Sequence, residues 1–232
     1  MRSCTSASRN LLRRQARELL ATKPTPVVVV HGLWLNGLET FLLRERLSVA
    51  GFAPVSFRYP STQASLEEVV DALAKRLRSF DGTVHLVAHS LGGAVALETL
   101  ARERDLPPGR VVLLGSPVQG SRAARAVASW SLGSQLLGAL AVAQLTREKE
   151  RRWDLPREIG LIAGSRSAGL GRLFADLPQP NDGTVAVDET HLPGANAHLV
   201  LDVSHLGMLW SQPVAGAVGR FLARGAFEAE RE

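Results

Sequence analysis

The chain has 232 residues, of which 45% are hydrophobic, and this length and composition fit one domain with a full core. Its formal net charge of +5 comes from residues 1–23, which hold six Lys or Arg against Glu18 alone; the remaining chain carries 21 charges of each sign. The rest of the protein therefore has no excess positive charge with which to bind the phosphate backbone of a nucleic acid, and we expect no nucleic-acid partner.

Residues 1–25 form a basic tail ahead of the predicted domain, which covers 26–232. The tail is rich in Arg and Ser, as in transit-like segments or segments that touch a membrane surface transiently, but a short surface helix with partly buried leucines is the favoured interpretation. It lacks the apolar stretch of a secretory signal, and no run approaches the length of a membrane span. Cys4 is the only cysteine, which excludes an internal disulfide and a thiolate zinc site. We expect a cytoplasmic location.

The first predicted element is the strand Val27 to Val30, a β-branched run without polar alternation, which is typical of a strand buried on both faces of a parallel sheet. Strands and helices then alternate along the chain, and this order predicts an α/β fold with a doubly wound, mostly parallel sheet and helices on both faces. The predicted helices are 38–50, 64–80, 91–104 and 206–224, and the later strands are 53–59, 84–89, 111–114, 159–163 and 199–203.

Residues 119–155 interrupt this alternation as a long insertion, and long connections in compact domains tend to be functional. The insertion is interpreted either as a lid over a substrate pocket or as a fixed helix packed on the sheet, because periodicity does not report motion. Its apolar side chains are expected to face inward, with Arg122 and Arg125 outward. These apolar side chains are Val127, Trp130, Leu132, Leu136, Leu137 and Leu140. Trp130 is thus a candidate pocket residue.

A serine stands between a predicted strand and a predicted helix, in the segment Ala88-His89-Ser90-Leu91-Gly92-Gly93. A sharp turn at this point lifts the Ser90 hydroxyl clear of the backbone at a helix N-terminus, where the dipole favours developing negative charge. The usual pattern is G-x-S-x-G, and Ala88 replaces its first glycine. The flanking strand and helix favour a nucleophile over a simple helix cap.

The first strand ends in His31-Gly32-Leu33-Trp34, at the edge where open α/β sheets place their sites. An acyl-transfer intermediate needs two N–H donors for its oxyanion, and Leu33 and Leu91 are the candidates for these backbone donors. Gly32 also fits a tight turn with no catalytic role. Trp34 is a candidate pocket wall, with a core tryptophan as the alternative.

A serine nucleophile needs a histidine to take its proton and a carboxylate to orient that histidine. In enzymes that carry the nucleophile on such a turn, the chain order is serine, acid, histidine. His205 follows the last strand and is the predicted base; His191 and His198 fit solvated or structural roles. Asp182 lies in an Asp-Gly turn between the last two strands and is the predicted acid. Asp188 is the reserve candidate.

Three further residues are less suited to catalysis. Asp202 lies within the last predicted strand and would have to reach sideways. His89 adjoins Ser90, but neighbouring side chains at such a turn point in different directions, so we interpret it as structural. His85 lies inside a strand and is typical of a core histidine.

These segments, with Gly115-Ser116-Pro117, occur in the order seen in the α/β-hydrolase superfamily, and the chain resembles small bacterial lipases and esterases and GPI-inositol deacylase-like hydrolases over residues 26–224. The resemblance implies a sheet of about six parallel strands, no metal, no cofactor, and ester hydrolysis through an acyl-enzyme. The leading hypothesis is a carboxylic ester hydrolase that acts on a lipid-like or short acyl ester. A thioesterase or acyltransferase with the same triad is the alternative. A non-catalytic binding protein on this fold ranks lower, because no triad member is missing.

Overall fold

A computed structural model describes residues 23–168 and 176–228 of the chain. Its centre is a six-stranded sheet in the order β2-β1-β3-β4-β5-β6, with every neighbouring pair parallel. This confirms the predicted fold class. The strands are β1 (Thr25–Val30), β2 (Phe52–Phe57), β3 (His85–His89), β4 (Val111–Leu114), β5 (Ile159–Gly164) and β6 (Ala197–Leu201).

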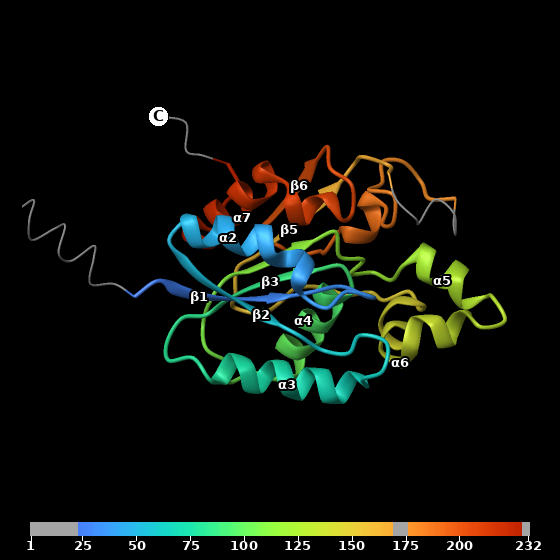
Figure 1. The fold of residues 1–232 in the computed structure, drawn as a ribbon, viewed down its shortest axis with the longest axis horizontal. Coiled ribbons are helices and arrows are strands. Elements are labelled where there is room, and N and C mark those ends of the chain that lie inside the picture. The colour runs from blue at the N-terminus through green and yellow to red at the C-terminus, as the bar shows by residue number, and fades with distance from the viewer. Residues whose placement is uncertain (1–22, 169–175, 229–232) are drawn as a thin grey trace, which may run out of the picture.

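Helices cover both faces of the sheet, with α2 and α7 above it and α3 and α4 below it in Figure 1. The α-helices are α2 (Phe41–Val49), α3 (Leu66–Arg78), α4 (Leu91–Arg102), α5 (Arg122–Ala128), α6 (Gly133–Leu145) and α7 (Gln212–Arg224). Short 3-10 helices are η1 (Leu38–Thr40), η3 (Val187–Thr190) and η4 (Gly207–Trp210). The sheet is thus doubly wound, as the alternation of elements predicts.

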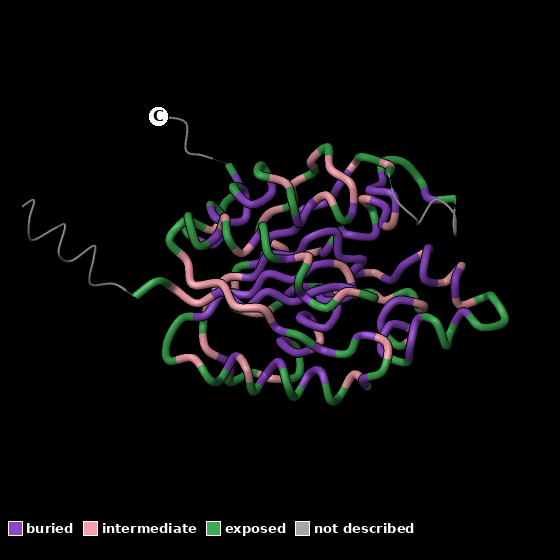
Figure 2. Tube along the Cα trace, in the orientation of Figure 1, coloured by how far each residue is buried: buried purple, intermediate pink, exposed green. Residues whose placement is uncertain are grey.

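Strand β1 shows why an unbroken valine run forms a central strand. Val28 and Val30 pack into the core between the sheet and α3, α4 and α6, whereas Val27 and Val29 pack into the core beneath α2 and α7. Successive side chains of a strand point to opposite faces, so a strand with two buried faces needs apolar residues at every position. Figure 2 shows the buried residues concentrated along these central strands.

The closing segment differs in detail from the predicted helix 206–224. It divides into η4 and α7, because Ser211 caps α7 by accepting a hydrogen bond from the Val214 N–H and Pro213 follows in the first turn. β6 ends at Leu201 instead of Val203; it is an edge strand whose residues are only partly buried or exposed, so its apolar pattern marks its limits poorly.

The insertion forms α5 and α6, which pack together and, through α6, against α4 and α3. Val127, Leu137 and Leu140 are buried as predicted. The expectation that the six named apolar side chains of the insertion face inward is wrong for three of them, which lie at the surface. These are Trp130, Leu132 and Leu136, which are 47%, 65% and 52% exposed.

The basic tail predicted as a surface helix lies largely outside the described residues. Among the residues that are described, none of the helices has the length and apolar character needed to cross a bilayer.

Candidate active site

The site is built at the carboxyl ends of the central strands, the edge at which α5 and α6 also lie in Figure 1. Ser90 stands between β3 and α4 with φ 55° and ψ −125°, a conformation that is rare for a residue with a side chain. The turn is tight because the end of β1 and the loop that follows it lie against it. A Cβ at Gly32 would lie 2.9 Å from the Ser90 Cβ, and one at Gly92 would lie 2.5 Å from the His31 carbonyl oxygen. Glycine is therefore required at both positions.

The structure brings the three predicted triad residues together. His205 Nε2 lies 2.9 Å from Ser90 Oγ, and His205 Nδ1 lies 2.7 Å from Asp182 Oδ2. The Thr184 and Val185 N–H groups both donate to the other oxygen, Asp182 Oδ1, at 2.9 and 2.7 Å. Because a carboxylate only accepts hydrogen bonds, Nδ1 of His205 carries the proton and Nε2 is free to accept from the Ser90 hydroxyl.

The side chain of His89 forms a hydrogen bond with the backbone of His205. Its Nε2–H donates to the His205 carbonyl oxygen at 3.0 Å, and the two rings lie 4.6 Å apart. His89 is fully buried, and burial, followed by the neighbouring His205, holds its pKa well below the usual value. A neutral His89 keeps positive charge away from the histidine that must accept a proton. The side chain thus acts on the position of His205, not on Ser90.

The loop after β1 is held by its own histidine. The Tyr59 N–H donates to His31 Nε2 at 3.3 Å, so Nδ1 carries the hydrogen that reaches the Gly32 carbonyl at 2.9 Å. The Tyr59 hydroxyl donates to the His31 carbonyl at 2.9 Å, and the two rings stack with centroids 4.4 Å apart. These contacts fix the backbone that leads to Leu33.

The two predicted oxyanion donors come from the loop after β1 and from the start of α4. Leu33 follows Gly32 and lines a cavity that Ser90 also lines. Leu91 is the first residue of α4, where a backbone N–H has no partner within the helix, and its side chain is fully buried in the core.

This cavity, called the catalytic cavity below, has a volume of about 330 Å³, and Ser90 and His205 both line it. Its walls are mostly aliphatic, and six of its lining residues belong to the insertion. They include Leu33, Ala123, Ala124, Val127, Leu137, Leu145, Val185 and Leu206. Such a lining favours an apolar group beside the hydroxyl of Ser90.

Trp34 lines the catalytic cavity, whereas Trp130 is not among its lining residues. The expectation that Trp130 contributes to the pocket is therefore wrong, because Trp130 lies in the exposed connection between α5 and α6. Trp34 has φ 58°, its N–H donates to Ser61 Oγ at 3.1 Å, and its indole N–H donates to the Leu136 carbonyl at 3.0 Å. The loop after β1 is thereby tied to α6.

The two alternative acids, Asp188 and Asp202, form ion pairs with arginines and not with His205. Asp188 forms a two-bond ion pair with Arg122 at 2.8 and 2.9 Å, and Asp202 pairs with Arg166. His198 Nε2 lies 2.8 Å from Thr190 Oγ1, and its ring lies against His191. The geometry therefore joins only Asp182 and His205 to Ser90 among these candidates.

A model of the alpha/beta hydrolase family matches residues 27–226, which include Ser90, Asp182 and His205. The chain belongs to the α/β-hydrolase family. The resemblance to the α/β-hydrolase superfamily inferred from the motifs is thereby confirmed. A search of curated proteins gave no match.

Solved structures share the α/β-hydrolase fold at low sequence identity. The Bacillus licheniformis lipase BlEst2 in propeptide form is 20% identical with a TM-score of 0.71; the match covers 90% of this chain but only 53% of that one. The RedJ thioesterase from the prodiginine biosynthetic pathway in Streptomyces coelicolor is 20% identical with a TM-score of 0.56, covering 90% and 92%. A Paleococcus ferrophilus monoacylglycerol lipase is 16% identical with a TM-score of 0.56, covering 86% and 95%. This chain thus spans about half of the first protein.

Two glycines that this α/β-hydrolase needs near its acid receive no role from the sequence: Gly115 is recognised only as part of a motif, and Gly164 is missed. A Cβ at Gly115, which has φ 51°, would lie 3.1 Å from both Asp182 Oδ2 and His205 Nδ1. One at Gly164 would lie 2.8 Å from the Asp182 Cβ. Both glycines stand at or just after the ends of strands, which is the signal that points to them. Each leaves room for the carboxylate beneath the histidine.

Proposed function

We propose that this α/β-hydrolase cleaves carboxylic esters with an apolar acyl group, through an acyl-enzyme on Ser90. The observation that carries the proposal is the unbroken hydrogen-bonded chain from Ser90 through His205 to Asp182, which opens onto an aliphatic cavity. This arrangement meets the geometric requirement for a serine nucleophile: the base within hydrogen-bond reach and itself oriented by a third group.

In the first half of the reaction, Ser90 Oγ attacks the ester carbonyl carbon while its proton passes to His205 Nε2. The carbonyl electron pair moves onto oxygen, and the Leu33 and Leu91 N–H groups stabilise that oxyanion. When the tetrahedral intermediate collapses, the bond to the alcohol oxygen breaks and His205 returns the proton to this leaving group. The acyl group is then bound to Ser90 as an ester.

In the second half, a water molecule attacks the acyl carbonyl and gives a proton to His205 Nε2. Collapse of this intermediate breaks the bond to Ser90 Oγ, which takes the proton back, and the carboxylic acid leaves. Asp182 stays ionised throughout and stabilises the imidazolium that forms at His205. The reaction needs only the residues of this chain and water.

The walls of the catalytic cavity support an acyl group of short to medium length. A volume of about 330 Å³ with aliphatic side chains on most sides is near the lower end of ligand sites, so it favours one apolar chain over a bulky polar group. A lipid-like ester with a single acyl chain fits this description. A cytoplasmic location stays a prediction from the sequence.

The test is hydrolysis of p-nitrophenyl esters from acetate to palmitate, by the wild-type protein and by Ser90→Ala. We expect turnover that is highest for medium chains and that falls by a factor of about 10⁴ or more in Ser90→Ala. Acyl-thioesters of the same chain lengths, assayed alongside, show whether the acyl donor is an oxygen ester. Equal turnover by wild type and Ser90→Ala would contradict the proposal.

A further inference from the structure

Glu189 is a buried acid that the proposed mechanism does not use. It lies in η3 and is only 5% exposed, whereas its neighbour Asp188 lies near the surface. Burial raises the pKa of Glu189, and hydrogen bonds from the backbone of Arg122 and Ala186 oppose that rise. A buried carboxylate is costly unless it is well paired, so the partners that compensate this one are informative.

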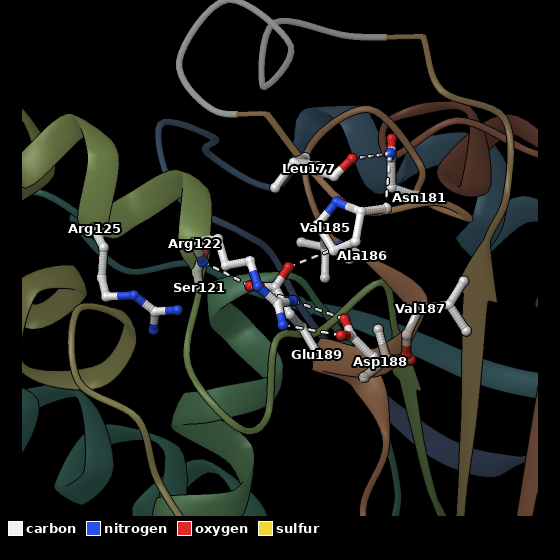
Figure 3. Close-up of polar contacts among 12 residues, drawn as sticks. Ser121, Arg122, Arg125, Leu177, Asn181, Val185, Ala186, Val187, Asp188 and Glu189 are labelled. Carbon is white, nitrogen blue, oxygen red and sulfur yellow. Dashed lines mark hydrogen bonds and ion pairs between the residues drawn. The ribbon is translucent and has the colours of Figure 1, made fainter.

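One oxygen of Glu189 holds the start of the helix that walls the catalytic cavity. Oε1 accepts a hydrogen bond from the Arg122 N–H at 2.6 Å, and Arg122 is the first residue of α5. This N–H has no partner within the helix, and the positive end of the helix dipole favours a carboxylate there. Figure 3 shows the contact, with Arg122 directed toward both Glu189 and Asp188. The next residues of α5, Ala123 and Ala124, line the cavity.

The other oxygen of Glu189 holds the turn that carries the acid. Oε2 accepts from the Ala186 N–H at 2.8 Å, as Figure 3 also shows. The preceding residue, Val185, donates its N–H to Asp182 Oδ1 at 2.7 Å and accepts from the Asp182 N–H at 3.0 Å. We call residues 181–186 the acid turn. Glu189 therefore fixes the end of the turn whose backbone orients the Asp182 carboxylate.

We propose that Glu189 is a positioning residue that couples helix α5, a wall of the catalytic cavity, to the orientation of Asp182. This inference rests on the proposed function, because it assumes that Asp182 orients the catalytic histidine. A carboxylate with one oxygen on each segment transmits a displacement of α5 to the acid turn. Misplacement of a catalytic group by about 1 Å can lower a rate by about 100-fold, so loss of one of these bonds has a measurable effect.

Asp188 supplies a matched control for a merely structural tie. It joins the same helix to the same 3-10 segment through its ion pair with the Arg122 side chain, at 2.8 and 2.9 Å. This pair is partly exposed, and its two hydrogen bonds run from the Arg122 guanidinium to the Asp188 carboxylate. Asp188→Asn therefore removes an attachment of α5 without removing the bridge to Asp182.

The first experiment compares Glu189→Gln with Asp188→Asn, with kcat expressed per active site titrated by a fluorophosphonate. Glutamine keeps one acceptor oxygen, but its NH₂ group faces one of the two N–H groups, so one of the two bonds is lost. We expect kcat per site to fall about ten-fold in Glu189→Gln and less than about two-fold in Asp188→Asn. A kcat per site within two-fold of wild type in Glu189→Gln, with only a lower melting temperature, would overturn the proposal.

A second comparison removes the backbone donor and leaves Glu189 intact. Arg122→Pro deletes the side chain and also the N–H at the first helical position, where proline is well tolerated. Arg122→Ala deletes the side chain alone, with its ion pairs to Asp188 at 2.8 Å and to Glu189 at 3.8 Å, so the difference between the two variants reports the N–H. We expect Arg122→Pro to lower kcat per site about as much as Glu189→Gln does, with Arg122→Ala near wild type. Combined with Glu189→Gln, the proline substitution is expected to add little, since both remove the same bridge. Equal values for the proline and alanine variants would contradict the coupling.

A readout that does not depend on turnover separates this inference from the proposed function. The proton on His205 Nδ1, held by Asp182 at 2.7 Å, gives a downfield ¹H NMR resonance that Asp182→Asn identifies by its loss. We expect this resonance to shift in Glu189→Gln and to stay in place in Asp188→Asn. If the wild-type protein neither hydrolyses esters nor reacts with the fluorophosphonate, the proposed function fails. In that case a shifted His205 resonance in Glu189→Gln would still support the coupling, and an unchanged resonance would refute it.

Discussion

Filling the catalytic cavity from α5 should shorten the acyl chain that the protein accepts. Ala124 is buried, lines the cavity and lies on the helix that forms one of its walls. Ala124→Leu adds three carbon atoms to a space of about 330 Å³ and displaces about three methylenes of a bound acyl chain. At about 0.8 kcal/mol for each buried methylene, the loss is about 2.4 kcal/mol, or roughly 60-fold in kcat/KM.

The assay compares p-nitrophenyl octanoate with p-nitrophenyl acetate. We expect kcat/KM for octanoate to fall roughly 60-fold in Ala124→Leu and kcat/KM for acetate to change about two-fold, because acetate does not reach the new side chain. Ala126→Leu is the control: the same change on the same helix, at a half-buried residue that is not among those lining the cavity. Octanoate hydrolysis within three-fold of wild type in Ala124→Leu, with intact labelling, would refute this location of the acyl chain.

Three other changes test separate parts of the structure. Trp34→Phe removes the indole donor to the Leu136 carbonyl. We expect thermal unfolding to show a loss of about 1 kcal/mol in the free energy of unfolding, and ester hydrolysis to show a lower kcat/KM. No change in either quantity would contradict a link between the loop after β1 and α6. Burial lowers the pKa of His85 to about 4, below its usual 6.5, and two neighbouring arginines add to the effect. The stability that neutral His85 contributes is therefore fully present above about pH 6.5 and is lost as the pH falls toward 4. His85→Asn cannot titrate, and we expect its urea midpoint to fall less than that of wild type between pH 7 and about 4.5; equal falls would argue against His85 as the group responsible. Gly92→Ala places a Cβ 2.5 Å from the His31 carbonyl oxygen, and we expect a loss of about 1–3 kcal/mol in urea unfolding, which an unchanged midpoint would exclude.

The fold could be predicted from the sequence because its signals are local and repeated. The Val27 to Val30 run identifies a strand with two buried faces, and the strand, turn and helix around Ser90 fix where the sheet presents its nucleophile. Parallel strands bring their carboxyl ends to one edge, so chain order places Asp182 and His205, which follow β5 and β6, at the same edge of the sheet as Ser90. The edge strand β6 is predicted two residues too late, because its residues are only partly buried or exposed and its apolar pattern is therefore weaker.

The insertion shows where such reasoning stops. Helix α5 ends at Ala128 and α6 begins only at Gly133, so Trp130 and Leu132 lie in a break between two helices. Of the adjacent Leu136 and Leu137 in α6, only Leu137 is buried. A periodic pattern read across that break assigns the wrong faces. Glu189 is missed for a different reason, because its burial depends on packing between α5 and the acid turn, and nothing in its own sequence surroundings distinguishes it from the exposed Asp188.

The most direct test of the central claim is to find which residue a fluorophosphonate modifies. After treatment and digestion, peptide mass spectrometry locates the added phosphonyl group. We predict one modified site, Ser90, with labelling abolished in Ser90→Ala and slowed greatly in His205→Ala, since a serine without its base is a weak nucleophile. Labelling of another residue, or labelling that persists in Ser90→Ala, would contradict the assignment of Ser90 as the nucleophile.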